Sequence, residues 1–213
     1  MLQKYYQKGS LNFRDKILAL DYFLIFLILS LGIISIFAMY STEQGNFGYY
    51  TKSHSYRFFT FFLVFIVISF LRIQIWFKSA YIFYLLILLL LAAVDLYGVT
   101  ASGSKRWINL FFINLQPSEL MKVALIVFLS RFYYKIPSEN VTNLKYIFTP
   151  ILALLIPTLL VVAQPDLGTA VLILIGGISV IWLTGFRIKF FLYSFFVLIC
   201  LLPVGISFLK PYQ

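Results

Sequence analysis

Seven long apolar runs limit the folds open to this chain more than any other feature of its sequence. Most of these runs approach the roughly 20 residues that a helix needs to cross a bilayer. The strand-like alternation of apolar and polar residues that marks a β-barrel is absent. We therefore predict an all-α, polytopic transmembrane helix bundle that forms a single membrane domain over residues 1–213. The expected spans are residues 22–40, 58–71, 79–99, 120–134, 146–163, 167–186 and 190–209.

The composition excludes an ordinary soluble domain, because only 11% of the residues are charged and 62% are hydrophobic. A soluble domain of this size carries about a quarter charged residues. The net charge of +10 would suggest nucleic acid in a soluble protein, but here the cations cluster between apolar runs, so no nucleic-acid partner is expected. Eleven of the 17 Lys and Arg residues fall in the segments assigned to the inner side and five on the outer side. The positive-inside rule then places the N-terminus in the cytoplasm and the C-terminus outside.

Cys200 and His54 are the only cysteine and histidine of the chain. Their number excludes a disulfide framework and a metal cluster built on these residue types. We expect no metal site and no cofactor. A divalent cation is compatible with a phosphate-binding protein, but nothing in the sequence supports one. His54 is expected to be a plain loop residue, and the first apolar run is too long for a cleavable signal peptide.

Two short motifs share a Gln-Pro pair followed by an acid: QPSEL from Gln116 and QPDLG from Gln164. Each comes directly before an apolar run that is expected to lead inward from the outer side. Proline suits the first position of a helix, and the helix dipole favours an acid there. Glu119 and Asp166 can therefore be helix-start signals, or they can be functional acids.

Lys122 lies one turn into the predicted helix, where the dipole does not favour a cation. A charged side chain at membrane depth costs about 2.5 kcal/mol or more. Glu119 lies three positions earlier and so on the same helix face. The pair can be a structural bridge between helices, but intramembrane charges usually face a polar cavity. We predict that Glu119 and Lys122 line such a cavity, open to the outer side.

The outer loop before QPSEL carries two adjacent cations, Lys105 and Arg106, against the positive-inside bias. An arginine guanidinium can hold a phosphate through two parallel hydrogen bonds, so this pair predicts phosphate binding at the membrane surface. General attraction to anionic lipid is the alternative. The following segment, WINLFFINL, can lie on the membrane as a short interfacial helix. Asp95, near the outer end of the third span, is a weaker candidate for the same cavity.

Four segments in this order resemble motifs of the SEDS family, the shape, elongation, division and sporulation membrane proteins of bacteria. They are GSKRWINL, LQPSELMKVALIVFLSRF, QPDLGTAVLIL and the closing LKPYQ. The resemblance is closer to the RodA type than to the FtsW type, and it implies a multi-pass protein of the bacterial inner membrane with about ten helices. On the family pattern, Arg106, Glu119, Lys122 and Asp166 line the polar cavity and the outer groove. Lys105 joins them as an expected substrate-binding residue.

The resemblance implies a peptidoglycan glycosyltransferase that polymerises lipid II, a polyprenyl pyrophosphate disaccharide, during cell elongation. It also implies a class B penicillin-binding protein as partner. The aspartate proposed as catalytic base in this family is expected beyond Gln213, so no catalytic residue is assigned and the chain alone is expected to bind substrate poorly. Two alternatives stay open. One is a flippase or transporter for the lipid-linked precursor, and the other is a non-catalytic membrane scaffold of the elongation machinery.

Overall fold

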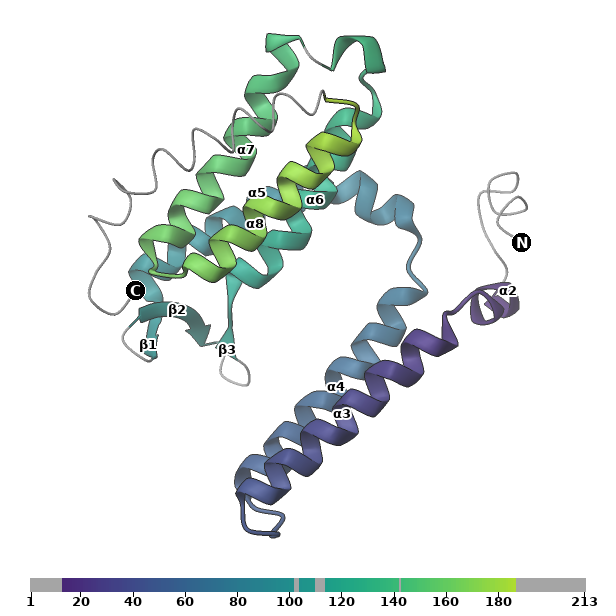
Figure 1. The fold of residues 1–213 in the computed structure, drawn as a ribbon, viewed down its shortest axis with the longest axis vertical. Coiled ribbons are helices and arrows are strands. Elements are labelled where there is room, and N and C mark those ends of the chain that lie inside the picture. The colour runs from purple at the N-terminus through teal and green to yellow at the C-terminus, as the bar shows by residue number, and fades with distance from the viewer. Residues whose placement is uncertain (1–12, 102–103, 110–113, 142, 187–213) are drawn as a thin grey trace. The chain divides into compact units, whose positions relative to one another are not determined.

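The computed structural model describes residues 13–101, 104–109, 114–141 and 143–186. These residues are mainly helical, as predicted (Figure 1). They divide into two compact units between Ile75 and Trp76. The single membrane domain expected over the whole chain stays a prediction.

The first unit holds three helices: α2 (Phe13–Leu18), α3 (Tyr22–Thr42) and α4 (Tyr49–Ser69). Helices α3 and α4 pack together as an antiparallel hairpin. The ring of Phe58 lies so close to the buried Gly32 that a Cβ atom there would stand 1.9 Å from it. Small residues allow this kind of close approach between membrane helices. The hairpin therefore depends on glycine at position 32.

His54 lies in α4 and not in a loop, so the loop assignment for this residue is wrong. Its Nε2 atom is 2.6 Å from the hydroxyl of Ser35 on α3. Helix α4 begins earlier than expected because Glu43, which follows α3 directly, accepts hydrogen bonds from the N–H groups of Tyr50 and Thr51, each at 3.0 Å. The hydrogen bonds from Thr51 and Tyr50 hold the pKa of Glu43 below its usual value. A local cap thus extends the helix into a polar stretch.

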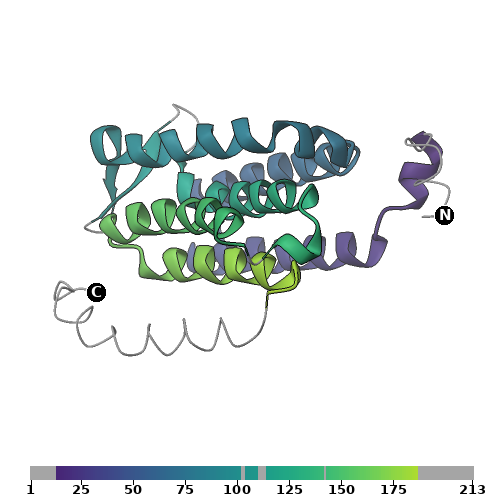
Figure 2. The same cartoon turned by 90° about the horizontal axis from the view of Figure 1, so that it is seen from above.

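The second unit is a bundle of four helices with a small sheet at one end (Figures 1 and 2). The helices are α5 (Ile73–Tyr97, whose first residues belong to the first unit), α6 (Pro117–Tyr134), α7 (Leu144–Ala163) and α8 (Leu167–Leu183). A short 3-10 helix, η1 (Ser138–Asn140), lies between α6 and α7. Buried apolar residues at helical spacing form the core, among them Met121, Leu125 and Leu129 of α6 and Ile173 of α8.

Three of the described helices are long and apolar enough to cross a membrane: α3, α5 and the part of α7 over residues 146–163. Helix α8 is apolar but has 17 residues, and α6 carries Glu119, Lys122 and Arg131 within its 18 residues. Six described helices, α3 to α8, stand at the places of the first six predicted spans. The seventh, residues 190–209, lies outside the described residues. The chain is a multi-pass membrane protein.

Helix α7 contains two prolines, Pro150 and Pro157, and continues through both of them. Proline has no N–H, so Pro157 leaves the carbonyl of Ala153, four residues earlier, without its helical hydrogen bond. The hydroxyl of Tyr84 on α5 donates to this carbonyl at 2.8 Å. Neighbouring helices are expected to supply such bonds when proline interrupts a membrane helix. The Tyr84 hydroxyl therefore supports the proline-containing helix from outside.

Tyr84→Phe should remove this support while keeping the aromatic ring in the core. We expect the free energy of unfolding to fall by about 1 kcal/mol, because the buried carbonyl of Ala153 loses its partner. Unfolding in mixed detergent micelles measures the change. Tyr81 is a half-exposed tyrosine one turn earlier on α5, so Tyr81→Phe is the matched control and should leave stability unchanged. An equal loss in both variants would contradict the role given to Tyr84.

The loop between α5 and α6 forms a three-stranded antiparallel sheet of β1 (Val99–Ala101), β2 (Ser104–Asn109) and β3 (Asn114–Leu115). Ile108 of β2 pairs with Leu115 of β3, and Trp107 pairs with Val99 of β1. The expected interfacial helix over WINLFFINL is therefore wrong for its described residues. Residues 107–109 pair with the neighbouring strands, and these pairings supply backbone hydrogen bonds that the ends of a short helix would lack.

Candidate functional site

The candidate site lies at the end of the bundle that carries the sheet, where α6 and α8 both begin (Figure 1). Strand β2 packs against α6, and α6 packs against α8. Both Gln-Pro motifs therefore lie at the same end of the bundle. The similarity between QPSEL and QPDLG reflects two helices that start side by side and lead in the same direction.

Asp166 is the N-cap of α8. Its Oδ1 atom accepts a hydrogen bond from the N–H of Thr169 at 3.2 Å, and its Oδ2 atom accepts one from the Thr169 hydroxyl at 2.9 Å. The side chain of Asp166 is buried, with 11% of its surface exposed. The helix-start interpretation of this acid is confirmed, but the burial and the further partners described next go beyond ordinary capping.

Arg106 extends from β2 to the junction between α7 and α8. Its Nε atom donates to the carbonyl of Gln164 at 3.3 Å, and its Nη2 atom donates to the carbonyl of Pro165. Its Nη1 atom lies 4.0 Å from Oδ1 of Asp166. The guanidinium is thus held by two carbonyls and a carboxylate, with about one third of the side chain exposed. The structure brings together two of the predicted residues, Arg106 and Asp166, which are 60 positions apart in the sequence.

Two glutamines complete this network, and the sequence did not point to them as site residues. Gln116 donates through Nε2 to Oδ2 of Asp166 at 3.1 Å. Gln164 is buried and donates through Nε2 to the carbonyl of Leu91 on α5 at 2.9 Å. The only signal was that both Gln-Pro motifs begin with the same residue. We call Arg106, Gln116, Gln164, Asp166 and Thr169 the arginine cluster.

Glu119 and Lys122 form the ion pair that their spacing predicts. The Nζ atom of Lys122 lies 2.9 Å and 2.8 Å from the two carboxylate oxygens of Glu119. About half of the Glu119 side chain is exposed and about a quarter of the Lys122 side chain. Among the described residues, no hydrogen bond or ion pair joins this pair to the arginine cluster. Both groups belong to the same end of the bundle, but they are separate.

Lys105 is exposed on β2. Successive side chains of a strand point to opposite faces, so Lys105 is turned away from the junction that Arg106 contacts. The described part of the chain offers Lys105 no ion pair. Asp95 is exposed on α5 and has no hydrogen bond or ion pair with the arginine cluster in the described residues.

The electrostatic balance of the site follows from these pairs. Asp166 stands beside Arg106 and Glu119 beside Lys122, whereas Lys105 and the exposed Asp95 form no ion pair among the described residues. The exposed ammonium of Lys105 can bind an anion with several oxygens as a point charge. Within the described ranges, no group of three or more His, Cys, Asp or Glu residues is placed to hold a metal ion.

This chain is similar in sequence to a known protein family and to several named proteins. A family model described as "Cell cycle protein", for FtsW, RodA and SpoVE, matches residues 18–213. The probable peptidoglycan glycosyltransferase FtsW of Buchnera aphidicola subsp. Schizaphis graminum is 30% identical over 166 residues, which cover 78% of this chain and 46% of that protein. The peptidoglycan glycosyltransferase MrdB of Escherichia coli K12 is 37% identical over 102 residues, covering 48% of this chain and 27% of MrdB.

Two solved structures share the fold. A chain from a study of the structural coordination of polymerization and crosslinking by a peptidoglycan synthase complex superimposes with a TM-score of 0.77 and 28% identity, over 92% of this chain and 57% of the other. The rod shape determining protein RodA of Thermus thermophilus gives a TM-score of 0.73 and 28% identity, over 86% of this chain and 60% of RodA.

The chain spans less than half the length of three FtsW relatives from Buchnera, between 39% and 46%. Within that portion, the family model and the two structural matches cover most of the chain. The chain belongs to the FtsW, RodA and SpoVE family of cell cycle proteins, which is the SEDS family that its motifs indicated.

Proposed function

We propose that this chain forms the lipid-substrate-binding part of a peptidoglycan glycosyltransferase that polymerises lipid II during cell elongation. Similar proteins are named as peptidoglycan glycosyltransferases, and a RodA structure shares the fold. The proposal places the protein in the bacterial inner membrane, with its N-terminus in the cytoplasm and the arginine cluster on the outer side. A class B penicillin-binding protein is the proposed partner, since a peptidoglycan synthase complex is among the similar structures.

The observation that carries the proposal is the arrangement of cations at the outer end of the bundle. Arg106 is held in one orientation by backbone carbonyls, and Lys105 beside it is exposed without an ion pair among the described residues. The exposed ammonium of Lys105 suits the pyrophosphate of lipid II as a point charge, while Arg106, on the opposite face of β2, holds this strand at the junction between α7 and α8. The apolar surfaces of the neighbouring helices suit its polyprenyl tail.

The other site residues have supporting roles in this proposal. Asp166 holds Arg106 in place and caps α8, so it acts as a positioning residue. The Lys122 side chain is partly exposed and can exchange Glu119 for a phosphate oxygen when substrate arrives. We assign the catalytic base to none of the described residues.

Binding of fluorescent lipid II to the chain in lipid nanodiscs tests this function. We expect Lys105→Ala and Lys122→Ala each to weaken binding about tenfold, which corresponds to about 1.4 kcal/mol for one lost charge contact. Lys78→Ala removes an exposed cation from the other end of the bundle and serves as the matched control, with unchanged affinity.

The same variants separate the alternatives. A scaffold without a substrate site would bind lipid II equally weakly in all of them. A flippase would bind lipid II but would also carry it across the bilayer of proteoliposomes, which the proposed function does not require. Unchanged affinity in both Lys105→Ala and Lys122→Ala would contradict the proposal.

A further inference from the structure

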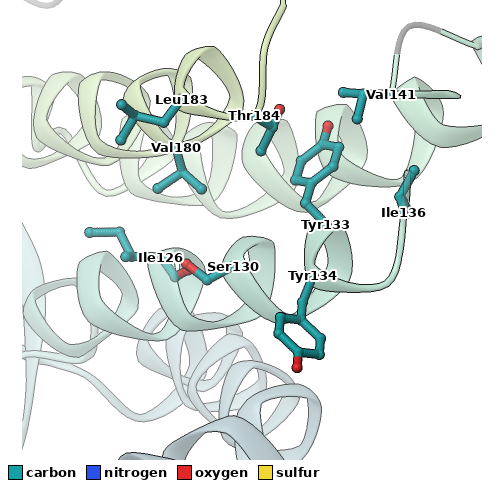
Figure 3. A pocket seen from close by; sticks show the side chains of 9 residues that line it. All are labelled: Ile126, Ser130, Tyr133, Tyr134, Ile136, Val141, Val180, Leu183 and Thr184. Atoms are coloured by element: carbon teal, nitrogen blue, oxygen red, sulfur yellow. The ribbon is translucent and has the colours of Figure 1, made fainter. Parts of the chain in front are cut away.

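A cavity of about 500 Å³ lies between α6 and α8, at the opposite end of these helices from the arginine cluster. This volume falls within the roughly 300–1,000 Å³ of typical small-molecule sites. Apolar side chains make up most of its wall, with Val180 and Leu183 on α8 and Ile126 on α6 (Figure 3). It therefore belongs to a different site from the one proposed for lipid II.

Three hydroxyl groups in the wall differ in whether they have a hydrogen-bond partner. The Ser130 hydroxyl donates to the carbonyl of Ile126 at 2.7 Å, and the Thr184 hydroxyl donates to the carbonyl of Ile181 at 2.6 Å. Tyr133 is buried, with 6% of its surface exposed, and its hydroxyl has no hydrogen-bond partner in the described part of the chain. Buried hydroxyls are almost always hydrogen-bonded in proteins. The Tyr133 hydroxyl therefore indicates a ligand atom that accepts a hydrogen bond.

The position of Tyr133 along α6 narrows the chemistry of that ligand. Tyr133 is the last residue but one of this helix, and Lys135 directly follows as its C-cap. Tyrosines at this level of a membrane helix lie at the boundary between hydrocarbon and headgroups. Lys135 is exposed and forms no ion pair with any described residue. A glycerophospholipid has the three groups that this site calls for. Its ester oxygen can accept a hydrogen bond from Tyr133, its phosphate can lie beside Lys135, and its acyl chain can fill the apolar cavity.

We propose that this cavity binds one acyl chain of a glycerophospholipid from the leaflet at this end of the bundle. The ester carbonyl accepts a hydrogen bond from the Tyr133 hydroxyl, and the phosphate lies beside Lys135. The exposed side chains of Tyr134 and Leu183 form the rim through which the acyl chain enters from the bilayer (Figure 3). Lipid binding in this cavity does not depend on catalytic activity of the protein.

Native mass spectrometry of the full chain, delipidated in detergent and titrated with dioleoyl phosphatidylglycerol, tests this site. The wild-type chain should retain one tightly bound lipid. Tyr133→Phe removes only the hydroxyl and should weaken that binding at least fivefold, and Val180→Trp places a bulky ring in the cavity wall and should weaken the binding further by obstructing the acyl chain. Ser130→Ala is the matched control, because the Ser130 hydroxyl is already bonded within its own helix.

Two results would overturn the proposal. The first is equal lipid retention by the wild-type chain, Tyr133→Phe and Val180→Trp. The second is a disulfide between a Ser130→Cys variant and the native Cys200, because it would show that a later part of the chain occupies the cavity. Tyr133→Phe keeps the ring that contacts Phe132 and Phe186, so a loss of folding is not expected to obscure the comparison.

Discussion

Arg106→Ala is expected to lower the free energy of unfolding by about 2 to 3 kcal/mol. The substitution removes the donors that the carbonyls of Gln164 and Pro165 use. It also leaves the carboxylate of Asp166, of which only 11% is exposed, without a cation nearby. Removing one partner of a buried charge pair is costly because the other charge stays buried. Unfolding in mixed detergent micelles gives the change in free energy.

Two further variants show whether this loss comes from the cluster. Arg106→Lys keeps the positive charge but cannot bond two carbonyls through a planar fork, so its loss should be intermediate. Combining Arg106→Ala with Asp166→Asn removes the unpaired charge and should recover part of the stability. Full stability in Arg106→Ala would mean that the guanidinium does not hold the junction between α7 and α8.

Gly177→Ala is expected to destabilise the bundle by about 1 to 3 kcal/mol through overpacking. Gly177 is buried where α8 meets two other helices. A Cβ atom at this position would lie 2.5 Å from Cδ1 of Leu154 on α7 and 3.1 Å from Cδ2 of Leu125 on α6. Both leucines are themselves buried, so they have little room to move.

Gly176 is the matched control for this prediction, because it neighbours Gly177 and lies in the same helix. A Cβ atom at Gly176 would meet only Ile126, at an ordinary contact distance of 3.7 Å. Gly176→Ala should therefore stabilise α8 by up to about 1 kcal/mol, since alanine favours helices over glycine. Thermal unfolding of both variants should show opposite shifts. Equal shifts would contradict the packing described for α6, α7 and α8.

The helices could be predicted from the sequence because each is an apolar run of near-membrane length. Their ends could not, since they depend on local caps that hydropathy does not detect. Helix α4 begins nine residues before the expected position 58, because Glu43 bonds the first N–H groups of a polar stretch. The sheet was missed for a similar reason: its middle strand contains Trp107 and Ile108 next to a long apolar segment, which also suits an interfacial helix.

The candidate site divides in the same way between local and long-range features. The Glu119 and Lys122 pair could be predicted, because a spacing of three residues places both side chains on one helix face. The contact of Arg106 with Asp166 could not, because it depends on how β2 packs at the start of α6 and α8. Gln116 and Gln164 lack a charge that would attract notice, and their role depends on the neighbours that folding brings to them.

Site-specific photocrosslinking tests most directly the claim that the end of the bundle that carries the sheet binds the lipid substrate. A photoreactive phenylalanine replaces the exposed Asn114 of β3, which leaves Lys105 and Lys122 in place, and is compared with one at the exposed position 78, at the other end of the bundle. Radiolabelled lipid II should crosslink to position 114, excess unlabelled lipid II should suppress the crosslink, and position 78 should remain unlabelled. Equal labelling at both positions, or none at position 114, would contradict a lipid II site at this end of the bundle.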